Sequence, residues 1–573
     1  MDNSEVNTSN VIETKNSLVS RIWRYKFCYL ISIPALLFII LMKYVPVIAE
    51  VRLPFIDYKP AQGIMNSKWV GMENLKSIIS QYYFPRIIQN SIILNVGFIT
   101  ICSAVAFIMI WGLSRISSKK TIAFFTTIFL IPLFIPPVVI SRWLIIASSK
   151  MYFLSDPVYA RLAYICVETL KYSGIPIILG IAAVNSYKSL HINEAGEYEG
   201  TSASALVKPV LKVIAAFSLI QLSLFLTDDF ELVLTMYNPK VYTTMDVFDT
   251  YMYRAGILQF GFSKSAAIWL IKLVVQLVTV TIAYLLVKKL FKNDLFKHVE
   301  EKSTANIYKH KGTNWVGLIP VLLYSGAILY ILFMILVYPF TLKSPPYGNM
   351  KEIMEIMPQN AFYKHFLASI AAVAVNAFIT VTLAYPLTAR KLPGRSFIKA
   401  ILIAAMGIGS YTISEYLYYR SLGMANTYLP FVIISSFNII NIFVLKSIFN
   451  SKYTVDKDTG ALSGKSEGNM FFTLFLPKVW RPLIALSVLQ FSSCWGSFYT
   501  SMIFTTNRNI FTPILIFRET ALSISNDISN ETVMFVKGAS LQLGAVITVV
   551  PIVLFLIFRH FFTSETFVGQ IRK

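Results

Sequence analysis

The chain has 573 residues, of which 55% are hydrophobic and only 14% are charged. Soluble proteins carry about 25% charged residues, so this composition excludes an ordinary soluble domain and indicates a membrane protein. The 51 Lys and Arg residues exceed the 29 Asp and Glu residues, which gives a net charge of +22. In a membrane protein such an excess indicates basic cytoplasmic loops rather than a nucleic-acid site.

Residues 1–16 are polar, and the first apolar run, residues 27–42, lacks a small-residue cleavage site. We therefore expect a cytoplasmic N-terminal tail over residues 1–26 followed by a membrane helix, not a signal peptide. Arg21, Arg24 and Lys26 would hold the start of this helix inside the cell.

Twelve segments are long and apolar enough to cross a bilayer, which takes about 20 residues. In chain order they are 27–50, 91–113, 122–147, 161–187, 209–228, 265–288, 315–340, 366–389, 397–420, 428–449, 481–504 and 539–562. Alternate loops are rich in Lys and Arg, which predicts that both termini are cytoplasmic. Because backbone in lipid must satisfy its own hydrogen bonds, the spans are expected to be helices and the fold all-α.

The chain divides at a hydrophilic stretch, residues 291–314, with six spans on either side. We predict a first half over 27–290, a cytoplasmic linker over 291–314 and a second half over 315–573. Each half has a polar loop between its fourth and fifth spans, near 190–213 and 455–480. Six is even, so both halves would insert in the same orientation, as parallel repeats.

Prolines interrupt several spans, among them Pro132, Pro136, Pro137 and Pro176. They indicate either packing kinks or broken helices that line a pathway, and the sequence leaves both interpretations open.

The two polar loops resemble the coupling loop of ABC importer permeases, which places acids, small residues, a Gly and a Leu-Pro at fixed spacing. The residues that carry this resemblance are Glu194, Ala195, Glu199, Gly200, Asp458, Gly464, Phe471, Leu476 and Pro477. In that family the loop docks onto an ATPase subunit. The resemblance therefore implies two permease halves of the type I importer fold, fused in one chain.

Further motifs resemble the permease pairs of importers for oligosaccharides and polysaccharide fragments. They include Trp69-Val70-Gly71-Met72-Glu73-Asn74-Leu75, Asp249-Thr250-Tyr251-Met252-Tyr253-Arg254-Ala255-Gly256, Leu392-Pro393-Gly394-Arg395 and Cys494-Trp495-Gly496-Ser497-Phe498. The resemblance implies a bacterial plasma-membrane protein, two copies of a separate ATPase that bind ATP and Mg²⁺, and an extracellular binding lipoprotein.

Both loops depart from the family pattern in different places. Lys212-Val213 stands where the first loop would have Leu-Pro, and Asp458, Ser463 and Lys465 replace the acids and the Ala of the second. The first loop thus keeps its acids and the second keeps its hydrophobic anchor, which leaves the identity of the ATPase open.

Nothing in the sequence indicates an enzyme, a metal site or a cofactor bound by this chain. The stretch from Gly460 to Ser466 is one residue short of a phosphate-binding loop, and a membrane helix rather than a buried strand precedes it. The five histidines are scattered and no two have metal-ligand spacing.

Ionisable and aromatic residues inside the spans are candidates for a substrate pathway. We expect a sugar to pass between the halves, along spans four, five, nine and eleven. The candidate residues are Glu168, Tyr172, Tyr411, Glu415, Tyr416, Trp495 and Tyr499. Among them, Trp495 is predicted to stack on a sugar ring and Glu415 to accept hydroxyl hydrogen bonds. The alternatives are an interfacial aromatic belt for the rings and structural pairing for the charges, such as Glu168 with Lys171.

The sequence thus predicts the membrane-spanning part of an ATP-driven importer, acting on an oligosaccharide delivered from outside. Two alternatives stay open: an ion-driven transporter of twelve spans, and a membrane scaffold or sensor that keeps the permease fold.

Overall fold

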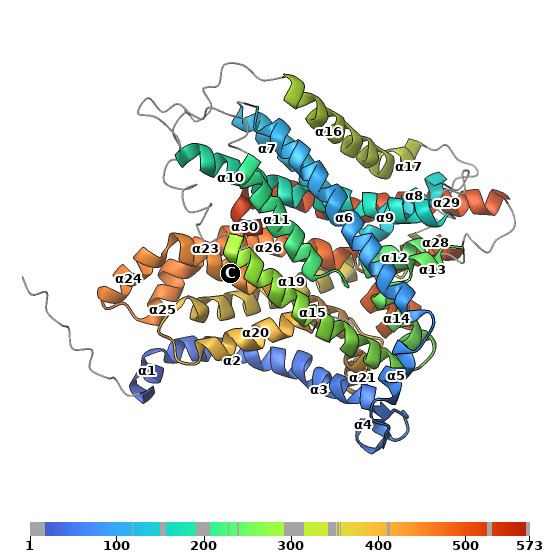
Figure 1. The fold of residues 1–573 in the computed structure, drawn as a ribbon, viewed down its shortest axis with the longest axis horizontal. Helices are drawn as coiled ribbons and strands as arrows, with labels where there is room; N and C mark the ends of the chain where they lie inside the picture. Colours follow the sequence, from blue (N-terminus) through green and yellow to red (C-terminus); the bar gives the residue numbers. More distant parts are fainter. Residues whose placement is uncertain are drawn as a thin grey trace, which may run out of the picture.

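A computed structural model describes residues 18–116, 118–148, 156–190, 207–226, 229–237, 240–290, 315–341, 351, 354–355, 357–408, 413–523 and 530–568. Within them the chain is an all-α membrane protein with one two-stranded hairpin (Figure 1). The expected linker at 291–314 lies outside the described residues.

The first half is built from long apolar helices joined by short ones. They are α1 (Leu18–Arg24), α2 (Lys26–Ile39), η1 (Ile40–Tyr44), α3 (Val45–Arg52), η2 (Leu53–Phe55), α4 (Gly63–Asn66), α5 (Glu73–Ile79), α6 (Phe84–Leu113), α7 (Lys119–Leu130), η3 (Ile131–Phe134), α8 (Pro137–Ser148), α9 (Pro157–Tyr172), α10 (Gly174–Leu190), α11 (Val207–Ser223), α12 (Phe230–Met236), α13 (Tyr242–Met245), α14 (Phe248–Tyr253), η6 (Arg254–Leu258) and α15 (Phe262–Leu290). The hairpin pairs β1 (Ile56–Asp57) with β2 (Lys68–Trp69) in antiparallel register.

The second half is also built from long helices joined by short ones. Its helices are α16 (Trp315–Leu336), α17 (Tyr338–Thr341), α19 (Ala361–Thr388), α20 (Arg395–Gly407), α21 (Ile413–Ser421), α22 (Leu429–Ser435), α23 (Ile440–Lys452), α24 (Thr454–Leu462), α25 (Glu467–Met470), η7 (Phe471–Phe475), α26 (Leu476–Gly496), α27 (Tyr499–Phe504), η8 (Arg508–Ile510), α28 (Pro513–Ser523), α29 (Asn530–Phe558), η9 (Arg559–Phe561) and α30 (Ser564–Val568).

In the described part of the chain, eight helices are long and apolar enough to cross a membrane, or ten if two bent pairs count as one span each. Each of the twelve expected segments contains helix, but 209–228 and 397–420 match none of these eight helices or two bent pairs. The count of twelve therefore stays a prediction.

The prolines divide into the two classes that the sequence left open. Pro34, Pro386 and Pro551 lie inside continuous helices. By contrast, the segment that contains Pro132, Pro136 and Pro137 is broken, with an 84° bend between its two helical parts. Proline lacks an N–H and its ring clashes with the preceding turn, so several prolines in six residues end the helix.

The first helix of each half packs on the other half. Helix α2 packs on α19, and their buried residues belong to one cluster that includes Cys28, Ala35 and Tyr385. Reciprocally, α16 packs along α6 (Figure 1), so closely that a Cβ on Gly112 would lie 2.4 Å from the Gly317 carbonyl oxygen. The two halves are therefore interlocked rather than placed side by side.

Candidate functional site

A cavity of about 640 Å³ lies between the two halves. The first half contributes residues from α9, α12, α14 and α15, and the second half contributes residues from α20, α21, α26 and α27. Ligand pockets have volumes of about 300–1,000 Å³, so this cavity can enclose a small molecule or part of a larger one.

The proline break forms part of the cavity wall. Pro136 and Pro137, at the 84° bend, both line the cavity. Across the boundary between the halves, Gly496 ends α26 against this bend, and a Cβ there would lie 3.2 Å from the Cβ of Pro136. The broken helix of the first half and the end of α26 thus meet at the wall.

Two ion pairs lie on the first-half side of the wall. The Lys171 Nζ is 3.0 Å from the Asp229 Oδ2, and the Lys272 Nζ is 2.5 Å from the Asp249 Oδ1. All four side chains line the cavity. Charges in a membrane are costly unless they are paired or hydrated, and these four are paired.

A third carboxylate of the wall, that of Glu231, joins the two halves. Its Oε1 accepts hydrogen bonds from the Ser497 hydroxyl at 2.6 Å and from the backbone N–H groups of Phe498 and Tyr499 at 3.1 and 3.0 Å. The ring of Tyr499 also packs on Phe230, with centroids 4.6 Å apart. First-half and second-half residues are therefore bonded directly at the cavity.

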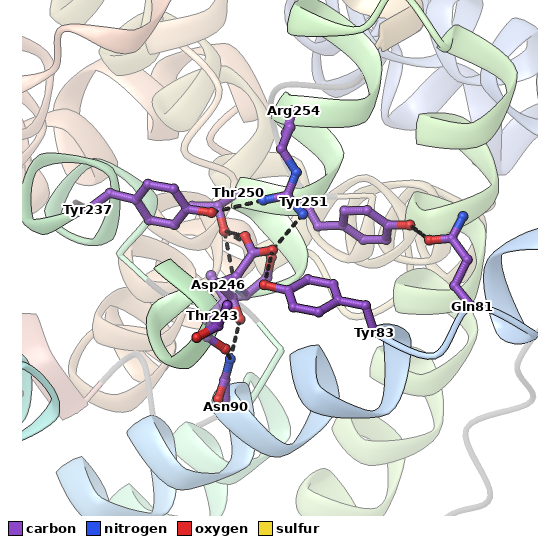
Figure 2. Close-up of polar contacts among 10 residues, drawn as sticks. Gln81, Tyr83, Asn90, Tyr237, Thr243, Asp246, Thr250, Tyr251 and Arg254 are labelled. Carbon is purple, nitrogen blue, oxygen red and sulfur yellow. Dashed lines mark hydrogen bonds and ion pairs between the residues drawn. The ribbon is translucent and has the colours of Figure 1, made fainter. Parts of the chain in front are cut away.

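The segment that carries Asp249 is held by a polar network on its other face (Figure 2). The Asp246 carboxylate accepts hydrogen bonds from Arg254 at 2.6 Å, Thr250 at 2.7 Å and Tyr83 at 3.0 Å. Arg254 also donates to the Tyr237 hydroxyl at 2.8 Å. Burial, and then the Asp246 carboxylate, raise the pKa of Tyr83 well above its usual range, so the phenol stays protonated and donates.

Helical spacing explains how the segment 246–254 contributes both to the polar network and to the cavity wall. Asp246, Thr250 and Arg254 follow each other at intervals of four and form the network, whereas Asp249 and Tyr253 line the cavity. The network anchors the segment to α6, because Asn90 donates to the Asp246 carbonyl oxygen at 2.9 Å (Figure 2). The sequence indicated residues 249–256 only through their resemblance to a family motif, and it did not indicate this network.

Of the predicted pathway residues, Tyr172 and Tyr499 line the cavity. Glu415 and Tyr416 line a much smaller neighbouring space, and the Glu415 Oε1 is 2.5 Å from the Lys43 Nζ of the first half. The structure places Glu168 in α9, buried and outside the described lining. Tyr411 lies outside the described residues.

Trp495 is placed behind the cavity wall rather than on it. Its side chain is only 2% exposed, and the indole N–H donates to the Ile547 carbonyl oxygen at 2.8 Å. The ring packs between those of His365 and Phe491, with centroids at 4.8 and 5.7 Å. Sugar stacking would require Trp495 to leave this packing, so the structure favours a role in the core.

Sequence reasoning missed two charged residues of the wall and the distant partner of a third. Lys272 lies in the middle of an apolar span, a signal that should have marked it, but Asp249 lies 23 residues away and carries no local signal. Lys171 was matched with Glu168 by helical spacing, and the structure also pairs it with Asp229, 58 residues away.

The second polar loop forms a short helical hairpin. Helix α24 ends at Leu462. Two residues later, Gly464 has a φ of +77°, a left-handed conformation that favours glycine, and the Lys465 N–H donates to the Gly460 carbonyl oxygen at 3.1 Å. Asp458 lies in α24, Phe471 in η7, and Leu476 and Pro477 begin α26. The first loop, with Glu194, Ala195, Glu199 and Gly200, lies outside the described residues.

The base of the second loop is tied to the end of α19. Lys457 donates to the Thr388 hydroxyl at 2.8 Å and lies 4.5 Å from the ring centroid of Tyr385. Tyr385 in turn donates to the Glu467 carboxylate at 2.6 Å. Burial lowers the pKa of Lys457 below its usual value, although the Glu467 carboxylate acts in the opposite direction. Large apolar side chains are exposed beyond this base, Val455 by 75% and Leu462 by 89%.

No family model matches the chain. The polygalacturonan/rhamnogalacturonan transport system permease protein YteP of Bacillus subtilis is 26% identical over 304 residues, which cover 48% of this chain and 92% of that protein. Protein LplB of the same organism is 26% identical over 301 residues, covering 49% and 94%. Among solved structures, a bacterial alginate ABC transporter in complex with an alginate pentasaccharide-bound periplasmic protein has a chain that is 23% identical with a TM-score of 0.41, covering 48% of this chain and 99% of that one.

About half of this chain thus accounts for almost the whole length of relatives such as YteP and LplB. The resemblance of the sequence to permeases of sugar importers is confirmed by these relatives, and the chain is a multi-pass relative of the ABC importer permeases.

Proposed function

We propose that this chain alone forms the translocation pathway of an ATP-driven oligosaccharide importer, with both permease halves in one polypeptide. The observation that carries the proposal is the cavity between the halves, whose wall is built from residues of both. In parallel-repeat transporters the axis between the repeats is the natural pathway, because both repeats present equivalent faces to it.

The chemistry of the wall suits a sugar. Tyr172, Tyr253 and Tyr499 offer aromatic faces, and Ser492 and Gln276 offer groups that can exchange hydrogen bonds with hydroxyls. A site built to bond hydroxyl groups rejects ligands that lack them, since an unpaired buried polar group costs about 1–3 kcal/mol. The name of YteP gives polygalacturonan and rhamnogalacturonan as what that relative transports.

We further propose that the second polar loop docks onto an ATPase subunit. Val455 and Leu462 expose large apolar side chains on an otherwise polar helix, and exposed apolar patches rimmed by polar residues mark sites of protein–protein contact. The first loop, through Glu194 and Gly200, is proposed to dock in the same way on a second copy. ATP and Mg²⁺ would then be bound by these partners, and an extracellular binding protein would deliver the sugar.

The mass of the intact purified complex tests the composition. The expected complex contains one copy of this chain and two ATPase chains. We also propose that both termini lie on the ATPase side of the membrane, which the mass does not test. A second permease subunit, a second copy of this chain, or purification without any ATPase would each contradict the proposal.

A matched pair of glycine variants tests the coupling. Gly464 and Gly423 have φ angles of +77° and +71°, and in both cases a Cβ would meet nothing within 4 Å. Gly464→Val should therefore uncouple ATP hydrolysis from sugar uptake, whereas Gly423→Val imposes the same backbone strain far from the docking loop and should leave coupling intact. Equal coupling in the two variants would remove the docking loop from the proposal.

A further inference from the structure

The cavity wall carries more negative than positive charge. Its described charged residues are three carboxylates, Asp229, Asp249 and Glu231, and two ammonium groups, Lys171 and Lys272, so their formal sum is −1. No arginine is among the described lining residues. Among the described lining residues, the two lysines are thus the only positive charges that an anionic ligand could meet.

Both lysines are engaged by carboxylates of the protein itself. Lys171 bonds to Asp229 at 3.0 Å and Lys272 to Asp249 at 2.5 Å. A carboxylate on the ligand would have to displace one of these partners and leave an Asp uncompensated, or stay unpaired beside three like charges. Either arrangement is unfavourable, because like charges repel each other more strongly inside a protein than in bulk water.

Uncharged hydroxyl groups meet no such obstacle. A hydroxyl can donate to a carboxylate oxygen without breaking the ion pair, and charge-assisted hydrogen bonds of this kind are the strong ones. The rings of Tyr172, Tyr253 and Tyr499 accept the apolar faces of sugar rings whether or not the sugar is charged. The charges of the wall, rather than its aromatic residues, therefore decide between neutral and acidic sugars.

We infer that the cavity selects uncharged oligosaccharides and rejects those that carry uronate carboxylates. The inference rests on the proposed function and narrows its substrate class. It separates this chain from YteP, whose named substrate polygalacturonan is a polymer of uronic acid units.

Uptake from two labelled mixtures tests the inference in the organism that carries this gene, compared with a strain that lacks it. One mixture holds uronate oligosaccharides from a polysaccharide hydrolysate, and the other holds the same oligosaccharides after their carboxyl groups have been reduced to alcohols, together with neutral plant oligosaccharides. Gene-dependent uptake of neutral sugars should exceed that of uronates at least about 10-fold. Comparable or preferred uptake of uronates overturns the inference and leaves the proposed function standing, whereas gene-dependent uptake of neither mixture overturns both.

Charge variants connect the preference to the cavity. Asp249→Asn frees the Lys272 charge and should reduce the neutral-to-uronate ratio by about 10-fold. The double variant Asp249→Asn with Lys272→Gln removes both charges, keeps the formal sum at −1 and should keep the original ratio, which also controls for folding. Asp57→Asn, on the exposed hairpin, is the matched surface control. An unchanged ratio in a folded Asp249→Asn protein overturns the inference.

Discussion

The cavity wall and the layer packed behind it contain the same kinds of residue in different surroundings. On the wall, Tyr172 is only partly buried and lines the cavity. Behind it, Trp495 is enclosed by other rings and its N–H is satisfied by a backbone carbonyl. The difference teaches that enclosure and hydrogen-bond satisfaction, not residue type, separate a pathway aromatic from a core aromatic.

The charges show the same contrast. Arg254 and Asp246 are bonded within one half and fix a segment in place, with Asp246 fully buried. Glu231, by contrast, bonds to backbone and hydroxyl groups of the other half. A change in the relative position of the halves leaves the first arrangement intact and must break the second.

The largest effect is expected for Trp495→Ala, which should lower the free energy of unfolding by about 3–5 kcal/mol because it removes a fully enclosed ring. Thermal unfolding of the purified full chain measures this change. Trp480→Ala is the control, because Trp480 is 44% exposed. A Trp495→Ala protein of normal stability that no longer takes up sugar would instead place Trp495 in the pathway.

Arg254→Met should destabilise the protein by about 2 kcal/mol, less than a fully buried ion pair because solvent screens Arg254 in part. The loss arises because Asp246 keeps its charge without its main partner. Adding Asp246→Asn to this variant should recover part of the stability. Arg86→Met, at an exposed position on α6, is the control and should unfold at the wild-type temperature. If its unfolding temperature drops as much as that of Arg254→Met, the network has no special role in stability.

Glu231→Gln should cost about 1–2 kcal/mol, because three donors of the second half lose a charged acceptor. Ser497→Ala removes only one of these donors and should cost about half as much. The comparison is read from thermal unfolding of both variants beside the wild type. Stability unchanged in Glu231→Gln would show that the bond between the halves contributes nothing.

The smallest effect on stability is expected for Tyr172→Phe, within about 0.5 kcal/mol, because the ring remains. The wall nevertheless loses a hydroxyl, so the sugar concentration for half-maximal uptake should rise about five-fold. Tyr82→Phe is the control, since Tyr82 is 98% exposed. Equal uptake curves for the two variants would remove the Tyr172 hydroxyl from the pathway.

Sequence periodicity and hydropathy located helix in all twelve expected segments, because membrane helices are set by local composition. The bend at Pro132 to Pro137 could be predicted from the sequence for the same reason, since proline acts on its own turn. The partners of Lys171 and Lys272 could not be predicted, because Asp229 and Asp249 are brought to them by packing between different helices. The burial of Trp495 likewise depends on α29, which follows it by dozens of residues.

The exchange of first helices between the halves sets an order of events during biosynthesis. Tyr29 of α2 bonds to the Pro393 carbonyl oxygen, 364 residues later in the chain. At a ribosomal rate of about 5–20 residues per second, α2 waits about 20 to 70 seconds in the bilayer before its packing partner is made. During that interval its small and polar face, around Ser32 and Ala35, is exposed to lipid or to a membrane chaperone. The nascent first half therefore cannot complete its packing until the second half has been translated.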